Sequence, residues 1–186
     1  MKGREIVLLI FIILAGLLLT QTDKGHINWN WGVDWGEWEG PFFGGSHEFT
    51  AQETKTIDSP LPEELVVANS HGDVEVQPSA DGTLTVFLET KAYRRSEEEA
   101  REAAQGVHLT VDRQGSKLVL STNRDTFRKK RFRTNWRIRL PEGRSIDIQN
   151  SYGLVKTEKT GRTSVINSHG AVTAQDVRGA FVCRTS

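Results

Sequence analysis

The chain has 186 residues, and its 24 Lys and Arg residues balance 24 Asp and Glu residues, so the formal net charge at pH 7 is zero. This length suggests one compact domain, or one domain with a tail, and the balanced charge argues against a general polyanion binder. The single cysteine, Cys183, excludes an intramolecular disulfide framework and a cysteine-rich zinc site. The 17 glycines and the modest hydrophobic content of 37% favour a thin, strand-rich architecture over a packed helical bundle.

Residues 1–22 are typical of an export signal. Lys2 and Arg4 precede an unbroken non-polar run from Ile6 to Leu19. The run ends in large leucines, which fit a cleavage site poorly, so we expect an uncleaved signal anchor that forms a transmembrane helix. A cleaved signal peptide and a buried globular helix are the alternatives. The basic residues would keep the N-terminus in the cytoplasm, which makes this a single-pass protein of the bacterial cytoplasmic membrane with the bulk of the chain exported.

Residues 23–59 are predicted to form a Trp- and Gly-rich linker. Four of the five tryptophans lie here, namely Trp29, Trp31, Trp35 and Trp38. The segment has no helical period, and its glycines interrupt any strand pattern. We interpret the tryptophans as interface aromatics, in a belt at the membrane surface or a flap over the domain. The alternative is a polysaccharide-binding module in which the exposed rings stack on sugars.

An internal repeat follows, with the form apolar-x-apolar-x-Asn/Thr-Ser-x-Gly-x-Val. Three copies span residues 65–74, 146–155 and 163–172, and a fourth begins at Phe181. Alternation places the two apolar residues and the Asn or Thr of each copy on one face of a strand. The glycine supplies a turn that needs a positive φ. The repeat-turn residues are Asn69, Gly72, Asn150, Gly153, Asn167 and Gly170.

Each copy reads as a strand, a glycine turn and a second strand, and only stacked copies could bury its apolar face. We therefore predict an all-β fold over residues 60–186, a repeat-built β-solenoid or stacked β-sheet with one short inserted helix. The aligned Asn and Thr side chains should form hydrogen-bonded ladders along the stack. Cys183 occupies a predicted core position. The fourth copy is incomplete, so we expect the sequence to be a fragment truncated at its C-terminus.

The insertion between the first two copies has its own pattern. Residues 83–90 and 107–111 alternate as strands, and residues 117–121 and 136–140 suggest a β-hairpin. Residues 96–105 predict the helix, with Ser96 as its N-cap and Gly106 just after its end. This helix is expected to cover an edge or an end of a sheet.

A basic run crosses the end of this insertion. Its cations alternate with apolar residues, so a strand would have an arginine-rich outer face and an aromatic inner face. The candidate patch for lipid headgroups or teichoic-type polymers consists of Arg128, Lys129, Lys130, Arg131, Arg133, Arg137 and Arg139. The alternative is a solvated edge strand whose cations prevent pairing between molecules. Export makes nucleic acid the weakest candidate partner.

No catalytic or metal-binding motif stands out. The sequence lacks a phosphate-binding glycine loop, a nucleophile elbow and an HExxH motif. His71 and His169 occupy equivalent repeat positions, but only the first copy follows its glycine with an aspartate, Asp73. We therefore predict a non-enzymatic protein without catalytic residues, metal or cofactor.

The Asn-Ser-x-Gly-x-Val copies resemble the bacterial "putative adhesin" family of β-strand-repeat domains, long classed as a domain of unknown function, over residues 60–186. The resemblance implies an exported or membrane-anchored protein with a toast-rack-like sheet and a role in adhesion or surface interaction. Some relatives are associated with envelope-stress regulators. The alternative function is therefore a regulatory or scaffolding protein whose exported domain binds lipid or a membrane protein. Expected partners are the membrane and an envelope polymer, lipid or membrane protein.

Overall fold

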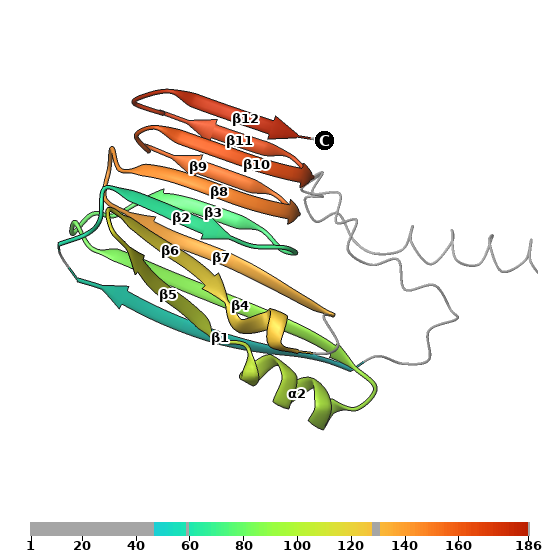
Figure 1. The fold of residues 1–186 in the computed structure, drawn as a ribbon. Helices are drawn as coiled ribbons and strands as arrows, with labels where there is room; N and C mark the ends of the chain where they lie inside the picture. The colour runs from blue at the N-terminus through green and yellow to red at the C-terminus, as the bar shows by residue number, and fades with distance from the viewer. Residues whose placement is uncertain (1–46, 59, 128–130, 186) are drawn as a thin grey trace, which may run out of the picture. The chain divides into compact units, whose positions relative to one another are not determined.

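The computed structural model describes residues 47–58, 60–127 and 131–185, which form two six-stranded sheets and one short α-helix (Figure 1). Sheet A contains, in spatial order, β1 (His47–Ile57), β4 (Leu84–Arg94), β7 (Phe132–Leu140), β3 (Val74–Pro78), β9 (Val155–Glu158) and β11 (Val172–Gln175). Sheet B contains β12 (Phe181–Thr185), β10 (Thr163–His169), β8 (Ser145–Tyr152), β2 (Glu64–Ala68), β6 (Lys117–Thr122) and β5 (Leu109–Gln114). The prediction of a mostly-β fold with one short helix is confirmed.

The repeat sets the strand register of sheet B. Leu65 pairs with Ile146, Ile146 with Thr163, and Thr163 with Phe181, so equivalent positions of the four copies lie side by side in parallel strands. From β8 onward the chain alternates between sheets B and A, and β9 and β11 also pair in parallel. Each repeat therefore contributes one strand to each sheet.

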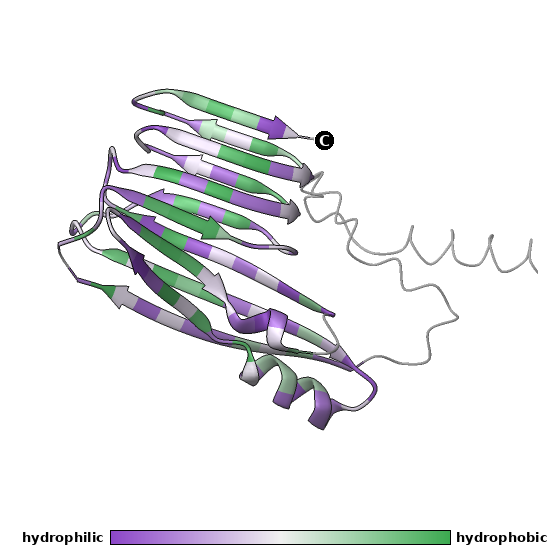
Figure 2. Ribbon diagram, viewed as in Figure 1, coloured by the Kyte–Doolittle hydropathy of each residue, from purple (hydrophilic) through white to green (hydrophobic). Residues whose placement is uncertain are grey.

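The core lies between the two sheets, because one side of each repeat strand is apolar. Val67 and Ile148 of sheet B and Val76 and Ile138 of sheet A are fully buried. Alternating green and purple along the strands in Figure 2 follows the same two-residue period. Burying each such side chain contributes roughly 1.5–3 kcal/mol. Cys183 has the register predicted from the repeat, opposite Val165, but its side chain is exposed, so its assignment to the core was wrong.

Helix α2 (Glu97–Gly106) covers the ends of the long strands β1 and β4, where sheet B does not extend. The predicted N-cap is confirmed, because the Ser96 hydroxyl accepts a hydrogen bond from the Glu99 N–H at 3.2 Å. The helix buries Ala100, Ala103 and Ala104. It ends one residue later than predicted, since Gly106 is its last residue rather than the residue after it.

The predicted hairpin between residues 117–121 and 136–140 is wrong. β6 pairs with β5 and β2 in sheet B, whereas β7 pairs with β4 and β3 in sheet A. Both segments alternate as strands, but the long connection between them, which includes η1 (Asn123–Thr126), passes from one sheet to the other. β7 also lies inside its sheet, which corrects the interpretation of the basic run as an edge strand.

The predicted linker of residues 23–59 includes a strand. β1 pairs with β4 along eleven residues, from His47 opposite Arg94 to Ile57 opposite Leu84. Its inward positions include Phe49, Ala51 and Glu53, so it carries no apolar run that could identify it in the sequence. The β domain therefore begins before residue 60.

Within the described ranges, no helix is long and apolar enough to cross a membrane. The expected anchor, residues 1–22, lies outside those ranges.

Candidate functional site

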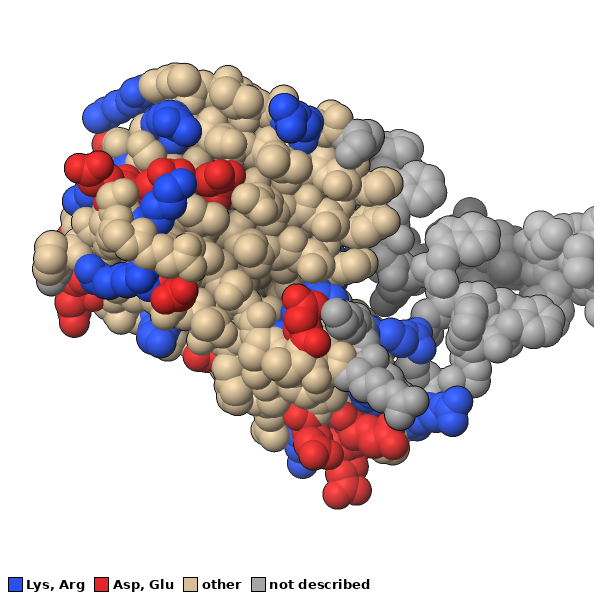
Figure 3. Space-filling model, in the orientation of Figure 1, with Lys and Arg blue, Asp and Glu red and all other residues tan. Residues whose placement is uncertain are grey.

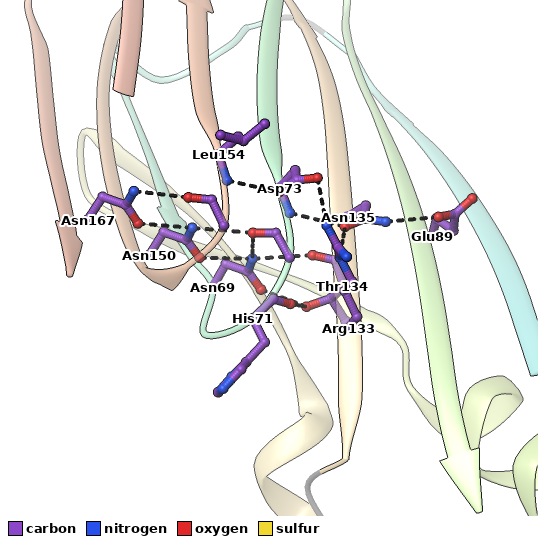
Figure 4. A network of polar contacts seen from close by, with 12 residues as sticks. Asn69, His71, Asp73, Glu89, Arg133, Thr134, Asn135, Asn150, Leu154 and Asn167 are labelled. Atoms are coloured by element: carbon purple, nitrogen blue, oxygen red, sulfur yellow. Dashed lines mark hydrogen bonds and ion pairs between the residues drawn. The ribbon is translucent and has the colours of Figure 1, made fainter. Parts of the chain in front are cut away.

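A buried ladder of amide side chains connects the repeats at the ends of the sheet B strands (Figure 4). The Asn69 Nδ2 donates to Asn150 Oδ1 at 3.1 Å, and the Asn150 Nδ2 donates to Asn167 Oδ1 at 3.2 Å. Asn150 and Asn167 are only 3% and 0% exposed, so these bonds lie away from water. The predicted ladder is therefore present, and it includes Thr134 of β7, whose hydroxyl donates to Asn69 Oδ1 at 2.6 Å.

The ladder also holds the glycine turns together. The Asn150 Nδ2 lies 3.3 Å from the Gly72 carbonyl oxygen, and the Asn167 Nδ2 donates to the Gly153 carbonyl oxygen at 3.0 Å. A Cβ atom at Gly153 would lie 2.1 Å from the Gly72 carbonyl oxygen, so the turns stack too closely for any side chain. These residues build the scaffold that holds the repeats together.

Three aromatic rings stack beside the glycine turns. His71, Tyr152 and His169 occupy the same repeat position, with ring centroids 4.7 Å and 4.5 Å apart along the column. Partial burial of the ring, and then the positive charge of Arg124, lower the pKa of His71. Both effects make protonation of His71 less favourable than protonation of an exposed histidine.

The outer face of sheet A, formed by the side chains that point away from sheet B, carries a network of charges. Arg133 Nη2 lies 3.0 Å from Asp73 Oδ2, and Arg137 Nε lies 3.6 Å from Glu75 Oε2. Lys156 Nζ lies 3.6 Å from Glu75 Oε1, so the network reaches β9. The outer face of sheet B, which is toward the viewer in Figure 3, has a broad area without charged side chains. The two faces therefore differ in chemistry.

Several cations of the basic run belong to this network. Arg133, Arg137 and Arg139 lie on the outer face of sheet A as predicted, with Phe132 and Trp136 buried on the inner side. Two of these arginines face carboxylates, and the Arg139 guanidinium lies over the Phe87 ring, 5.5 Å from its centroid. Arg131 is exposed just before β7. Arg128, Lys129 and Lys130 lie outside the described residues, and so do Trp29, Trp31, Trp35 and Trp38.

A groove of about 360 Å³ crosses this face over β1, β4, β7 and β3. We call it the sheet A groove. Its outward side chains include Gln52, Thr54, Phe87, Glu89, Asn135 and Arg137, with Asp73 and Glu75 along β3. The strand register explains this set, because Gln52 lies opposite Glu89 and Glu89 opposite Asn135, while Thr54 lies opposite Phe87 and Phe87 opposite Arg137. The groove therefore contains two cross-strand rows of functional groups.

Asn135 is the fixed centre of the groove. Its Oδ1 accepts from the Asp73 backbone N–H at 3.0 Å, and its Nδ2 donates to Glu89 Oε1 at 2.9 Å. Asp73 in turn accepts from the Leu154 N–H at 2.8 Å (Figure 4). These bonds fix side chains of β4, β7 and β3 in one arrangement. Sequence analysis missed Glu89 and Asn135, because strand pairing that places them together is not visible in one sequence.

The described residues contain no group of three or more His, Cys, Asp and Glu side chains placed to hold a metal ion.

No protein-family model matches the sequence, and no curated protein matches it. Among solved structures, the chain is similar to a "putative cell adhesion protein" from Clostridium sporogenes, with 9% sequence identity and a TM-score of 0.41 over 74% of this chain and 100% of that chain. It is also similar to a "putative adhesin" from Bacteroides fragilis, with 8% identity and a TM-score of 0.28 over 73% and 97%. A third, a "putative adhesin" from Parabacteroides distasonis, has 11% identity and a TM-score of 0.31 over 72% and 65%. The names of all three describe adhesion proteins.

Proposed function

We propose that this chain is a non-enzymatic, membrane-anchored envelope protein whose exported, solenoid-like β domain binds an envelope polymer through the outer face of sheet A. The observation that carries this proposal is the network of paired charges on that face, fixed across neighbouring strands. A scaffold of two sheets, held by the buried amide ladder, keeps these side chains in place without the entropy cost of ordering them on binding.

The pairing of charges favours a polymer over a lipid surface. An anionic membrane attracts unpaired cations, at about 1 kcal/mol for each Lys or Arg near the surface. Arg133 and Arg137 already face Asp73 and Glu75, at 3.0 and 3.6 Å, so much of their field is cancelled locally. The anion patch of the basic run stays a prediction, which the vesicle comparison below tests.

The binding face can be tested by blocking each sheet in turn. A large maleimide-linked polyethylene glycol would be attached to Thr56→Cys on sheet A or to Gln149→Cys on sheet B, both in a Cys183→Ser chain. Both positions are exposed, on outward faces of their sheets. We expect the full chain to co-sediment with purified bacterial cell walls, and to lose most of this binding only when position 56 is blocked.

Two results would contradict the proposal. One is equal loss of sedimentation from both blocked positions, or no sedimentation at all. The other is stronger binding to anionic phospholipid vesicles than to cell walls. Loss of that vesicle binding when Arg131, Arg133 and Arg137 become serine would then support the anion patch. Removing Arg113, Arg162 and Arg184, which are also exposed, is the control with the same change in charge.

Anchoring is tested by membrane fractionation and protease shaving of spheroplasts that express the full chain. We expect the protein in the membrane fraction at its uncleaved mass, and digested from outside. A protein that is protected from protease and found in the cytosol would contradict both export and anchoring.

A further inference from the structure

We infer that the sheet A groove binds a neutral, hydroxyl-rich glycan chain. This inference rests on the proposed function and names the class of polymer that the same face recognises. It uses a site different from the tryptophan segment, and it depends on residues that only the fold brings together.

The charges of the groove favour a neutral ligand. Three carboxylates on the outer side of the groove, those of Asp73, Glu75 and Glu89, are accompanied by Arg137 in the groove and by Arg133 and Lys156 beside it, which pair with Asp73 and Glu75. An anionic chain would be repelled by the first set, and a cationic chain by the second. Charged ligands therefore gain little, whereas a neutral ligand avoids the cost of removing its own charge from water.

The groove nevertheless contains charged donors and acceptors that make no hydrogen bond to the described residues. Glu89 Oε1 accepts from Asn135, and Oε2 has no hydrogen-bond partner among the described residues. Arg137 Nε lies 3.6 Å from Glu75 Oε2, and its guanidinium makes no hydrogen bond to the described residues. Sugar hydroxyls both donate and accept, so one hydroxyl-rich chain can use both groups.

Apolar surface lies between these polar groups. Phe87 is half-buried between Thr54 and Arg137 in one cross-strand row, and the Arg139 guanidinium lies 5.5 Å from its ring centroid. A sugar ring presents C–H groups on its faces and hydroxyls around its rim. Such a ring could contact Phe87 while its hydroxyls reach Glu89 and Arg137, which are neighbours of Phe87 along β4 and across to β7.

The geometry of the strands suits a chain better than a single sugar. The groove crosses four strands, and neighbouring strands lie about 4.8 Å apart. Beyond β3 the same sheet continues to β9 and β11. A linear glycan could therefore extend from the groove along this face.

The test uses the full chain, purified in a detergent without a sugar headgroup, and isothermal titration calorimetry. The probes are three neutral hexasaccharides (cellohexaose, chitohexaose and mannohexaose), with hexagalacturonate as the anionic comparison and hexaglucosamine as the cationic one. We expect at least one neutral probe to bind more tightly than both charged probes.

Variants locate the binding. Glu89→Gln keeps the size of the side chain but weakens the acceptor, and Phe87→Ala removes the apolar contact; each should weaken binding about tenfold. Thr54→Trp fills the groove from the exposed strand β1 and should abolish binding. Thr173→Trp and Glu158→Gln, on the same face but outside the groove, are the matched controls and should bind like the parent chain.

The inference is overturned if no neutral probe binds, if only a charged probe binds, or if Thr54→Trp binds as well as Thr173→Trp. Its failure can be distinguished from failure of the proposed function. Cell-wall sedimentation that persists in Thr54→Trp but is lost on blocking position 56 would support the outer face of sheet A as the binding face. It would exclude the groove as the binding site.

Discussion

Replacing Gly153 by alanine is expected to destabilise the domain by about 2–6 kcal/mol, a large part of the 5–15 kcal/mol that holds a typical domain folded. The residue has a φ of +134°, which side chains of L-residues rarely allow, at a cost of about 1–3 kcal/mol. The new Cβ would also lie 2.1 Å from the Gly72 carbonyl oxygen and 2.6 Å from its carbon. Both are backbone atoms of a neighbouring turn, so relief requires separating two repeats, which adds about 1–3 kcal/mol.

Gly143→Ala separates the cost of the positive φ from the cost of the close contact between turns. Gly143 has a φ of +76°, but an added Cβ there meets nothing within 4 Å. We expect it to cost only about 1 kcal/mol. Urea unfolding of the two variants beside the parent chain measures the difference. If both variants lose the same free energy of unfolding, the close stacking of the turns contributes nothing and the prediction is wrong.

Replacing Asn150 by alanine is expected to cost about 2–4 kcal/mol. The change removes the middle of the buried ladder, so Asn167 Oδ1 loses the donor at 3.2 Å and Asn69 Nδ2 loses the acceptor at 3.1 Å. A buried polar group left without a partner costs about 1–3 kcal/mol, and the small cavity adds to this. Thermal or urea unfolding measures the loss.

Asn150→Asp is expected to make the stability of the domain depend on pH. One carboxylate oxygen would replace the Nδ2 and face two acceptors, Asn167 Oδ1 and the Gly72 carbonyl oxygen, at about the present 3.2 and 3.3 Å. This repulsion and burial would raise the pKa of the new carboxyl in the folded state above its unfolded value. The variant should therefore be closest to the parent below the unfolded pKa, about 3.9, and lose stability as the pH rises through the folded pKa.

The matched control is Gln149→Glu, which makes the same amide-to-acid change at the neighbouring, exposed position of β8. We expect its stability difference from the parent to stay within about 0.5 kcal/mol at both pH 4 and pH 7. If Asn150→Asp lowers the free energy of unfolding by the same amount at pH 4 and pH 7, the prediction is wrong. The ladder would then accept an acceptor atom at this position as readily as a donor.

The repeat made the scaffold predictable from sequence. Its spacing indicated which residues align, and the structure pairs Asn150 with Asn167 and Val67 with Ile148 as expected. The same rule predicted an inward Cys183 and was wrong about burial, because register does not determine what covers a strand.

The groove could not be predicted, because it depends on strands that the repeat does not contain. β1 has no apolar run, and β4 and β7 lie in the insertion between the first two copies. Asn135 lies within the basic run, where its neighbours along the chain do not distinguish it. Its role depends on Glu89 and Asp73, which lie 46 and 62 residues away in sequence.

The position of β2 has a consequence for how the chain folds. Both of its neighbours in sheet B, β6 and β8, come later in the sequence, and Val67 meets Ile148 only 81 residues further on. β2 can therefore pair with β6 only after about residue 122 has emerged, and with β8 only after about residue 152, and such distant pairings make folding slow. Until β8 has emerged, one edge of this apolar strand stays unpaired and is exposed to association with other chains. Truncation within β8 should accordingly leave that edge of β2 uncovered and make the shortened chain prone to association.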